Sequence, residues 1–192
     1  MIRLQRQGAL RVSCAYRTVS EVLVIAGIIP IKPLARERKL IYDRKKEGDP
    51  DNIKADVRRA TMLEWQTLWE DRADSAWTRR LIKEVAPWSQ REHGEVNYFL
   101  TQFLSGHGLF QSYLSRMGKV VFPECVFCPD KQDNACHTFF DCDRWTIKKM
   151  ALEAEIGEIT PDNIVEKMLP NEESWIKYVE DLLRTKNLLT TP

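Results

Sequence analysis

The stretch Cys125-Val-Phe-Cys-Pro-Asp-Lys-Gln-Asp-Asn-Ala-Cys-His-Thr-Phe-Phe-Asp-Cys142 decides how this region of the chain folds. Its spacing is Cys125-x2-Cys128-x8-His137-x4-Cys142, which supplies three thiolates and one imidazole for a closed tetrahedral metal site. Zinc prefers this donor set, and a closed shell leaves no coordination position for a reacting water. The pattern therefore predicts a structural zinc knuckle, formed by a short β-hairpin and a helix, and disfavours a hydrolytic centre.

Two other interpretations of these residues stay open at this point. Cys136 directly precedes His137 and can replace it, which would give a site of four cysteines. The group can also be ordinary thiols beside a hydrogen-bonded histidine, without a metal. Disulfides are disfavoured, because five cysteines are an odd number and the N-terminus lacks the apolar core of a secretory signal. The remaining cysteine, Cys14, lies in an apolar segment and is expected to be buried.

Four aromatic residues lie close to the predicted ligands: Phe127, Phe139, Phe140 and Trp145. Most of them are expected to form the small core of the knuckle. At most one or two are expected to be free to stack on an unpaired base. The six tryptophans of the chain are interpreted as core residues, because most lie at helical spacing.

Composition and charge limit the possible partners. With 192 residues and 43% hydrophobic content, the chain can form a real core, and no apolar run is long enough to cross a membrane. Net charge is +1, but residues 1–46 carry 11 Lys and Arg against 3 Asp and Glu. Such a basic block suits a phosphate backbone, so RNA or DNA is the expected partner. The residues predicted to contact it are Arg11, Arg17, Lys32, Arg36, Arg38, Lys39, Arg44, Lys45 and Lys46.

Apolar periodicity predicts a mainly α-helical fold with the knuckle embedded in it. Helices are expected over residues 12–26, 33–46, 50–72, a short segment ended by Pro87, 96–104, 109–117 and 141–155, followed by one that starts at Thr160 and one capped by Asn171. A strand or hairpin arm is expected over residues 120–127. The chain is expected to comprise basic helices (1–48), a helical linker (49–119), the knuckle (120–146) and a helical tail (147–192).

Several sequence strings resemble one protein family. They are Arg11-Val-Ser-Cys-Ala-Tyr-Arg-Thr-Val-Ser20, Trp88-Ser-Gln-Arg91, Tyr98-Phe-Leu-Thr-Gln102, Ser105-Gly-His-Gly108, Pro123-Glu-Cys-Val-Phe-Cys128, His137-Thr-Phe-Phe-Asp-Cys142 and Thr160-Pro-Asp-Asn-Ile-Val165. Together they resemble the C-terminal part of the Pol polyprotein of insect non-LTR retrotransposons, most closely the type-1 elements that insert into ribosomal DNA. Cys136 departs from the family pattern, which usually has an acidic or polar residue there.

The resemblance implies that the parent polyprotein is a reverse transcriptase with an endonuclease that integrates by target-primed reverse transcription. It implies that the basic helices belong to a thumb-like region after the polymerase palm, and that the protein is intracellular and nuclear. The chain itself has no Tyr/Phe-Ala-Asp-Asp string for the metal-binding carboxylates of a polymerase. No Asp/Glu-x-Lys follows Pro161-Asp162 at a suitable place for a nuclease, so no catalytic residue is assigned in this segment.

Three functions compete at this stage. The leading hypothesis is a nucleic-acid-binding module that works with the rest of the Pol polyprotein. The second is a zinc-stabilised protein-interaction scaffold, with residues 175–183 as an exposed docking stripe. An independent enzyme is the weakest, because His93 and His107 lack a nucleophile or a carboxylate cluster nearby and are interpreted as structural or nucleic-acid-contacting residues.

Overall fold

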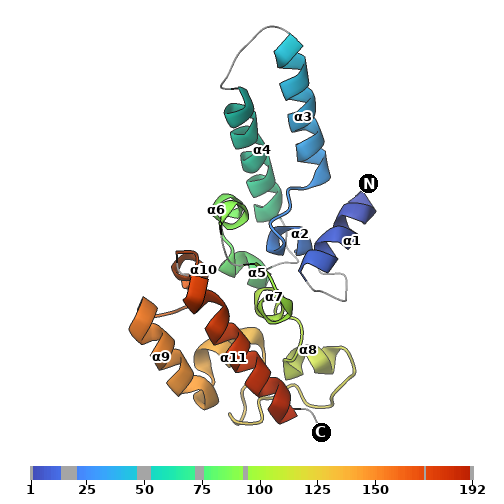
Figure 1. Cartoon of the computed structure of the whole chain (residues 1–192). Helices are drawn as coiled ribbons and strands as arrows, with labels where there is room; N and C mark the ends of the chain where they lie inside the picture. The colour runs from blue at the N-terminus through green and yellow to red at the C-terminus, as the bar shows by residue number, and fades with distance from the viewer. Residues whose placement is uncertain are drawn as a thin grey trace. The chain divides into compact units, whose positions relative to one another are not determined.

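The structure, a computed structural model, describes residues 2–13, 21–46, 53–71, 76–92, 95–170 and 172–190. Side chains are described for these residues except Ile2, residues 172–177 and residues 189–190. The chain divides into two compact units, Met1–Arg91 and Glu92–Pro192, and each is described by itself (Figure 1). Within the described ranges all regular elements are helical, which confirms the mainly α fold.

Unit 1 is built from short and medium helices. Its helices in the described residues are α1 (Ile2–Val12), α2 (Val22–Ile25), α3 (Ile31–Lys46), α4 (Ile53–Glu70), α5 (Ala76–Leu81) and α6 (Val85–Gln90). The helix expected over residues 12–26 corresponds to α2 alone among the described residues, because residues 14–20 lie outside them. Helix α1 was not expected. Its Gln5 side chain accepts a hydrogen bond from the Ile31 N–H at 2.8 Å, which satisfies a donor at the start of α3.

Helices α3 and α4, both predicted from apolar periodicity, lie side by side and antiparallel (Figure 1). The Glu37 carboxylate, which is buried, pairs with the Arg58 guanidinium at 2.9 Å across this contact. Tryptophans contribute to the core of this unit: Trp65, Trp69 and Trp88 are at most 2% exposed. The indole N–H of Trp69 donates to the Ile82 carbonyl at 2.8 Å, and that of Trp88 donates to the Val24 carbonyl at 2.6 Å.

The prediction that Pro87 ends a helix is wrong. The chain instead leaves α5 at Leu81 and starts α6 at Val85, so Pro87 lies in the first turn of the next helix. Proline is tolerated there because the backbone N–H groups of a first turn have no partner within the helix.

Unit 2 contains the knuckle segment and the helices around it. In the described residues these helices are α7 (Tyr98–Ser105), α8 (Gln111–Arg116), a π-helix (His137–Asp141), a 3₁₀ turn (Asp143–Trp145), α9 (Thr146–Ile156), α10 (Ile164–Met168) and α11 (Glu172–Thr190). Helix α7 begins at the Asn97 cap and ends at Gly106, whose φ of 67° is the left-handed conformation that favours glycine. Helix α11 packs along α7 and α9 (Figure 1).

The strand predicted over residues 120–127 is not present. One isolated antiparallel bridge joins Glu124 to Gln132, and this fully described segment has no other strand pairing. The knuckle therefore lacks the predicted β-hairpin. Loop hydrogen bonds hold the segment instead: the Cys125 N–H donates to the Lys131 carbonyl at 2.7 Å, and the Asp133 N–H donates to the Pro123 carbonyl at 3.0 Å.

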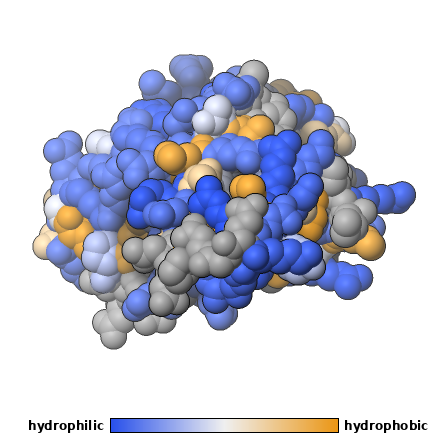
Figure 2. Space-filling model, turned by 90° about the horizontal axis from the view of Figure 1, so that it is seen from above, coloured by the Kyte–Doolittle hydropathy of each residue, from blue (hydrophilic) through white to orange (hydrophobic). Residues whose placement is uncertain are grey.

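Several sequence predictions fall outside the described residues. They concern Cys14, Arg17, His93, the cap at Asn171, and the side chains of Trp175 and Ile176. Among the helices that the structure describes, none is both long enough and apolar enough to cross a bilayer. On the face seen in Figure 2, hydrophilic side chains predominate and hydrophobic ones appear as separate small patches.

Candidate metal centre

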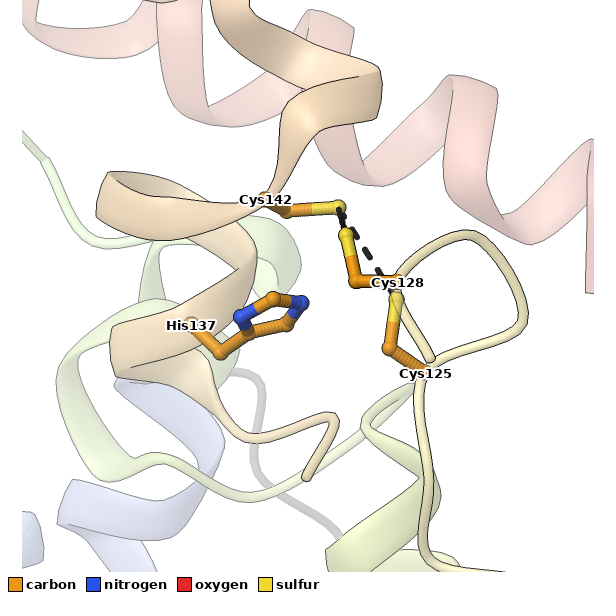
Figure 3. A group of neighbouring side chains, drawn as sticks. All are labelled: Cys125, Cys128, His137 and Cys142. Carbon is orange, nitrogen blue, oxygen red and sulfur yellow. Dashed lines mark hydrogen bonds between the residues drawn. The ribbon is translucent and has the colours of Figure 1, made fainter. Parts of the chain in front are cut away.

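Four side chains of the knuckle converge on one point (Figure 3). The ligand atoms of Cys125, Cys128, His137 and Cys142 all lie within 4.8 Å of one another. Cys125 and Cys128 come from the loop after α8, whereas His137 and Cys142 come from the π-helix and the residue that follows it. The structure thus brings together the four residues that the spacing had singled out as ligands.

The distances between the sulfur atoms fit a metal ion and not disulfides. The Cys142 sulfur lies 3.7 Å from that of Cys128 and 3.9 Å from that of Cys125. Sulfurs bound to one tetrahedral ion by bonds of about 2.3 Å are separated by about 3.8 Å, whereas a disulfide needs about 2.05 Å. The four residues are also at most 9% exposed, so a bound ion would be shielded from water.

The imidazole of His137 provides an independent test of the fit. Its Nε2 atom is buried and has no hydrogen-bond partner among the described residues. A buried, unsatisfied ring nitrogen is costly, and a metal ion at the centre of the cluster would satisfy it. Burial lowers the pKa of His137, the opposing influence of Asp133 and Asp141 being smaller. The neutral imidazole, which is the form that binds metals, is therefore favoured.

Local backbone structure aims the two C-terminal ligands at the same point. In an α-helix residues four apart share a face, and the wider π-helix at His137–Asp141 brings residues five apart, His137 and Cys142, toward the same side. The side-chain oxygen of Asn134 accepts the His137 N–H at 2.9 Å and so fixes the start of this turn. π-helical turns often occur at functional sites.

A tight turn positions the two N-terminal ligands. The Cys128 carbonyl accepts the Lys131 N–H at 3.4 Å, with Pro129 and Asp130 between them. Asp130 has a φ of 60°, and proline followed by a left-handed residue is the pattern of a type II turn. The Phe127 N–H approaches the Cys125 sulfur at 3.5 Å, which helps to orient this side chain.

Metal binding at this cluster has to release protons. Burial, with contributions from Cys128 and Cys125, raises the pKa of the Cys142 thiol to about 12, and the Arg144 backbone N–H acts in the opposite direction. A metal binds the thiolate, so the bound ion must displace the Cys142 proton at neutral pH.

Cys136 does not belong to the cluster of four ligand atoms. It is half-buried and lines an open pocket beside the cluster, together with Lys131, Gln132, Asn134 and Asp141. The geometry therefore favours His137 over Cys136 as the fourth ligand.

Most of the aromatic residues around the cluster are buried and one is partly exposed, as expected. Phe139, Phe140 and Trp145 are buried, and the Phe139 ring lies 4.5 Å from that of Phe103 in the core. Phe127 remains 40% exposed, with the Arg144 guanidinium 5.3 Å above its ring. Phe122 is 73% exposed, and it was not singled out from the sequence because it precedes the ligand motif.

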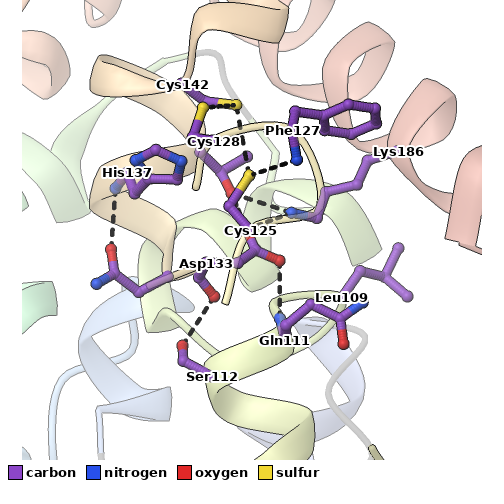
Figure 4. Close-up of polar contacts among 12 residues, drawn as sticks. Leu109, Gln111, Ser112, Cys125, Phe127, Cys128, Asp133, His137, Cys142 and Lys186 are labelled. Atoms are coloured by element: carbon purple, nitrogen blue, oxygen red, sulfur yellow. Dashed lines mark hydrogen bonds and ion pairs between the residues drawn. The ribbon is translucent and has the colours of Figure 1, made fainter. Parts of the chain in front are cut away.

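The sequence also gave no indication of a buried polar group beneath the cluster (Figure 4). Asp133 and Lys186 form an ion pair there, both almost fully buried, and Thr138 donates to the Asp133 carboxylate at 2.7 Å. Lys186 lies 53 residues after Asp133, on α11, so no local motif connects the two.

The described members of the basic set predicted to contact nucleic acid lie in unit 1, on α1 and α3. All that are described are exposed: Arg11, Lys32, Arg36, Arg38, Lys39, Arg44, Lys45 and Lys46. Arg36 forms an ion pair with Glu64 of α4. Lys32, Lys39 and Lys46 recur at seven-residue intervals and so fall on one side of α3. Tyr42, which is exposed, lies among them, and the Lys46 ammonium is 4.5 Å from the centre of its ring.

Two other sequence interpretations can be compared with the structure. The docking stripe proposed for residues 175–183 is wrong where it is described, because Val179, Leu182 and Leu183 are buried against the rest of unit 2. His107 stacks on Tyr113 with 4.7 Å between the ring centres, which suits the structural interpretation of this histidine.

Comparison with known proteins indicates the origin of this chain. The chain is similar to a retrovirus-related Pol polyprotein from type-1 retrotransposable element R1 4 of Nasonia vitripennis, with 25% identity over 156 residues. The alignment covers 72% of this chain and 40% of that protein, so the chain spans less than half of the relative's length. No family model matches the chain, and no solved structure matches it. The similarity supports a retrotransposon Pol-related origin.

Proposed function

We propose that the chain is a nucleic-acid-binding segment of a retrotransposon reverse transcriptase polyprotein. In this proposal a zinc-loaded knuckle and the basic helix α3 hold template RNA or target DNA during target-primed reverse transcription. Polymerisation and cleavage are carried out by other parts of the polyprotein, since this chain has no carboxylate pair for nucleotide transfer. A reverse transcriptase of this kind acts on chromosomal DNA, so we place the protein in the nucleus.

The exposed face of α3 carries the proposal. The inner side of the helix carries the buried residues Pro33 and Glu37, and the Glu37–Arg58 ion pair joins it to α4. The outer side is consequently held toward solvent, with a row of lysines and Tyr42. Lys32, Lys39 and Lys46 span about four turns of the helix. Positive charges repeated along one side in this way suit the regularly spaced charges of a phosphate backbone.

Zinc is the ion we assign to the knuckle. Three sulfurs and one imidazole nitrogen in a closed, buried arrangement are typical of structural zinc sites. The ion supplies folding free energy to a loop that has little secondary structure of its own. In this role Cys125, Cys128, His137 and Cys142 hold the ion, and no water is activated.

The knuckle contributes a second contact in this proposal. Phe127 is partly exposed beside Arg144 and Trp145, with its ring 6.4 Å from the indole. A planar ring beside a guanidinium group is a suitable surface for stacking an unpaired base. The α3 charges then supply affinity and the knuckle aromatic supplies a preference for single-stranded or distorted sites.

The alternative function is a zinc-stabilised protein-interaction scaffold. A different observation favours it, namely large apolar side chains exposed around the knuckle and on α9. They are Val121, Phe122, Val126, Ile147 and Met150. Exposed apolar residues in one region can mark a protein-binding surface, here for the rest of the polyprotein.

A salt-titrated binding assay separates the two functions. Zinc-loaded protein is mixed with fluorescent single-stranded RNA and duplex DNA, and anisotropy is recorded between about 50 mM and 200 mM salt. The proposal predicts binding whose log affinity falls linearly with log salt. Absence of binding at the lowest salt would refute it. Nuclease-resistant co-purification with polyprotein fragments would then favour the scaffold.

A further inference from the structure

Asp133 is a buried carboxylate inside the metal-binding loop, and the proposed function gives it no role. It is 1% exposed and lies between Cys128 and His137. One carboxylate oxygen accepts hydrogen bonds from the Thr138 hydroxyl at 2.7 Å and from the Lys186 ammonium. The other accepts the Gln111 N–H at 2.8 Å, at the start of α8 (Figure 4). Three separate segments of unit 2 therefore meet at this side chain.

The backbone of Asp133 adds to this connection. Its N–H donates to the Pro123 carbonyl at 3.0 Å, two residues before Cys125. Its carbonyl accepts both the N–H of Ser112 at 3.1 Å and the Ser112 hydroxyl at 2.8 Å. Since Thr138 directly follows His137, Asp133 is tied to the neighbours of one ligand from each half of the metal site.

Lys186 brings α11 into the same network. Its ammonium is buried and also donates to the Thr138 hydroxyl at 3.1 Å. A buried ion pair seldom stabilises a protein more than a well-packed apolar pair would, whereas loss of one partner leaves an uncompensated charge. Such a pair next to the ligand turn is therefore better explained by the fixed geometry that it provides than by a gain in stability.

A second contact holds α11 against the ligand turn. The Tyr178 hydroxyl donates to the Phe139 carbonyl at 2.7 Å, two residues after His137, and it is buried. Tyr178, Leu182 and Lys186 follow one another at four-residue intervals, so they lie along one ridge of α11. This ridge contacts the π-helix at one end and the Asp133 loop at the other.

We infer that Asp133 and Lys186 are positioning residues for the metal centre and that they couple metal binding to the docking of α11. Metal binding fixes residues 123–142, which present the carboxylate and the carbonyl that α11 requires. Docked α11 in turn keeps the ligands in their binding geometry, because coupling between two binding events is reciprocal. The inference rests on the metal assignment of the proposed function and is independent of nucleic-acid binding.

The test measures zinc affinity and the exchange of α11 amides in the full chain. Zinc affinity is obtained by competition with a chromophoric chelator for wild type, Lys186→Met and Asp133→Asn. Outer residues that orient metal ligands typically change affinity about 10- to 100-fold, and we expect losses in this range for both variants. The double variant should lose no more zinc affinity than the weaker-binding of the two single variants, since the two residues act as one unit. Hydrogen exchange of α11 should slow on zinc addition in wild type and not in Lys186→Met.

Arg184→Met is the matched control, because Arg184 lies on the same helix and forms an exposed ion pair with Glu180. It should keep zinc affinity within about twofold of wild type. Tyr178→Phe removes one oxygen and keeps the ring, so it probes the coupling with the least risk to folding, and it too should weaken zinc binding. Wild-type zinc affinity in every variant that folds, or α11 exchange that does not respond to zinc, overturns the inference. A wild-type chain that binds no zinc refutes the metal assignment instead.

Discussion

Neutralising two lysines on the outer side of α3 should weaken nucleic-acid binding by a calculable amount. Lys39 and Lys46 are exposed, lie seven residues apart on one side of the helix, and flank Tyr42. We therefore expect each to contact one phosphate. Glutamine at both positions removes two charges while it keeps an unbranched polar side chain of similar helix propensity.

Counterion release sets the size of the effect. Each phosphate contact contributes about 0.7 to the salt slope for a single strand and about 0.9 for duplex DNA. Loss of two contacts should therefore reduce the slope by about 1.4 to 1.8. The variant should therefore bind about 25- to 60-fold more weakly than wild type at about 0.1 M salt. When the affinities are extrapolated to about 1 M salt, variant and wild type should differ little.

The assay is fluorescence anisotropy at a series of salt concentrations, with circular dichroism to show that the variant is folded. Lys54→Gln with Arg59→Gln on α4 is the matched control, since both residues are exposed and the same two charges are lost. The control should retain affinity within a few-fold. An unchanged salt slope in the α3 variant, or an equal loss in the α4 control, would refute the assignment of α3 as the phosphate-binding face.

Three other features give measurable predictions. Burial raises the pKa of Cys142 to about 12, so its thiol must lose a proton when a metal ion binds. Zinc affinity should therefore rise at least about tenfold per pH unit from pH 6 to 8. Chelator competition that shows no pH dependence would contradict this. Trp88→Phe removes the hydrogen bond to the Val24 carbonyl and leaves a small cavity, and should lower the free energy of unfolding by about 2 kcal/mol in urea titrations; a loss below about 0.5 kcal/mol would argue against this core contact. Phe127→Ala should weaken single-stranded RNA binding by about 1–3 kcal/mol, with zinc content unchanged, and an unaltered affinity would exclude stacking at this ring.

Local sequence signals predicted which four side chains would come together at the candidate site. The four ligands lie within one short stretch, so their spacing alone indicated that they converge, and the structure brings them together. Helix α7 could also be predicted from the sequence, because its apolar residues repeat at helical spacing and Gly106 can adopt the left-handed conformation that ends the helix. The ligand role of these residues remains a prediction, as do the four segment boundaries drawn from the sequence.

The errors arose where tertiary contacts outweigh local pattern. Residues 120–127 are rich in β-forming residues, yet they have no neighbouring strand to pair with beyond one bridge. Pro87 was assigned to a helix end because proline is unfavourable inside helices, but the first turn of a new helix accepts it equally. An apolar stripe such as Val179 to Leu183 looks the same whether it is buried or exposed, and only the packing of α11 decides.

The buried Asp133–Lys186 pair could not be predicted for a different reason. Its two members lie 53 residues apart, and an isolated Asp or Lys is normally expected at the surface. A charge pair of this kind becomes visible only when the fold brings both residues into the same interior.

Zinc K-edge X-ray absorption on the purified chain, combined with elemental analysis, tests the central claim most directly. We predict one zinc per chain, bound by three sulfurs at about 2.3 Å and one nitrogen at about 2.0 Å. A chain purified without stoichiometric metal, or a zinc shell of four sulfurs, would contradict the assignment of Cys125, Cys128, His137 and Cys142.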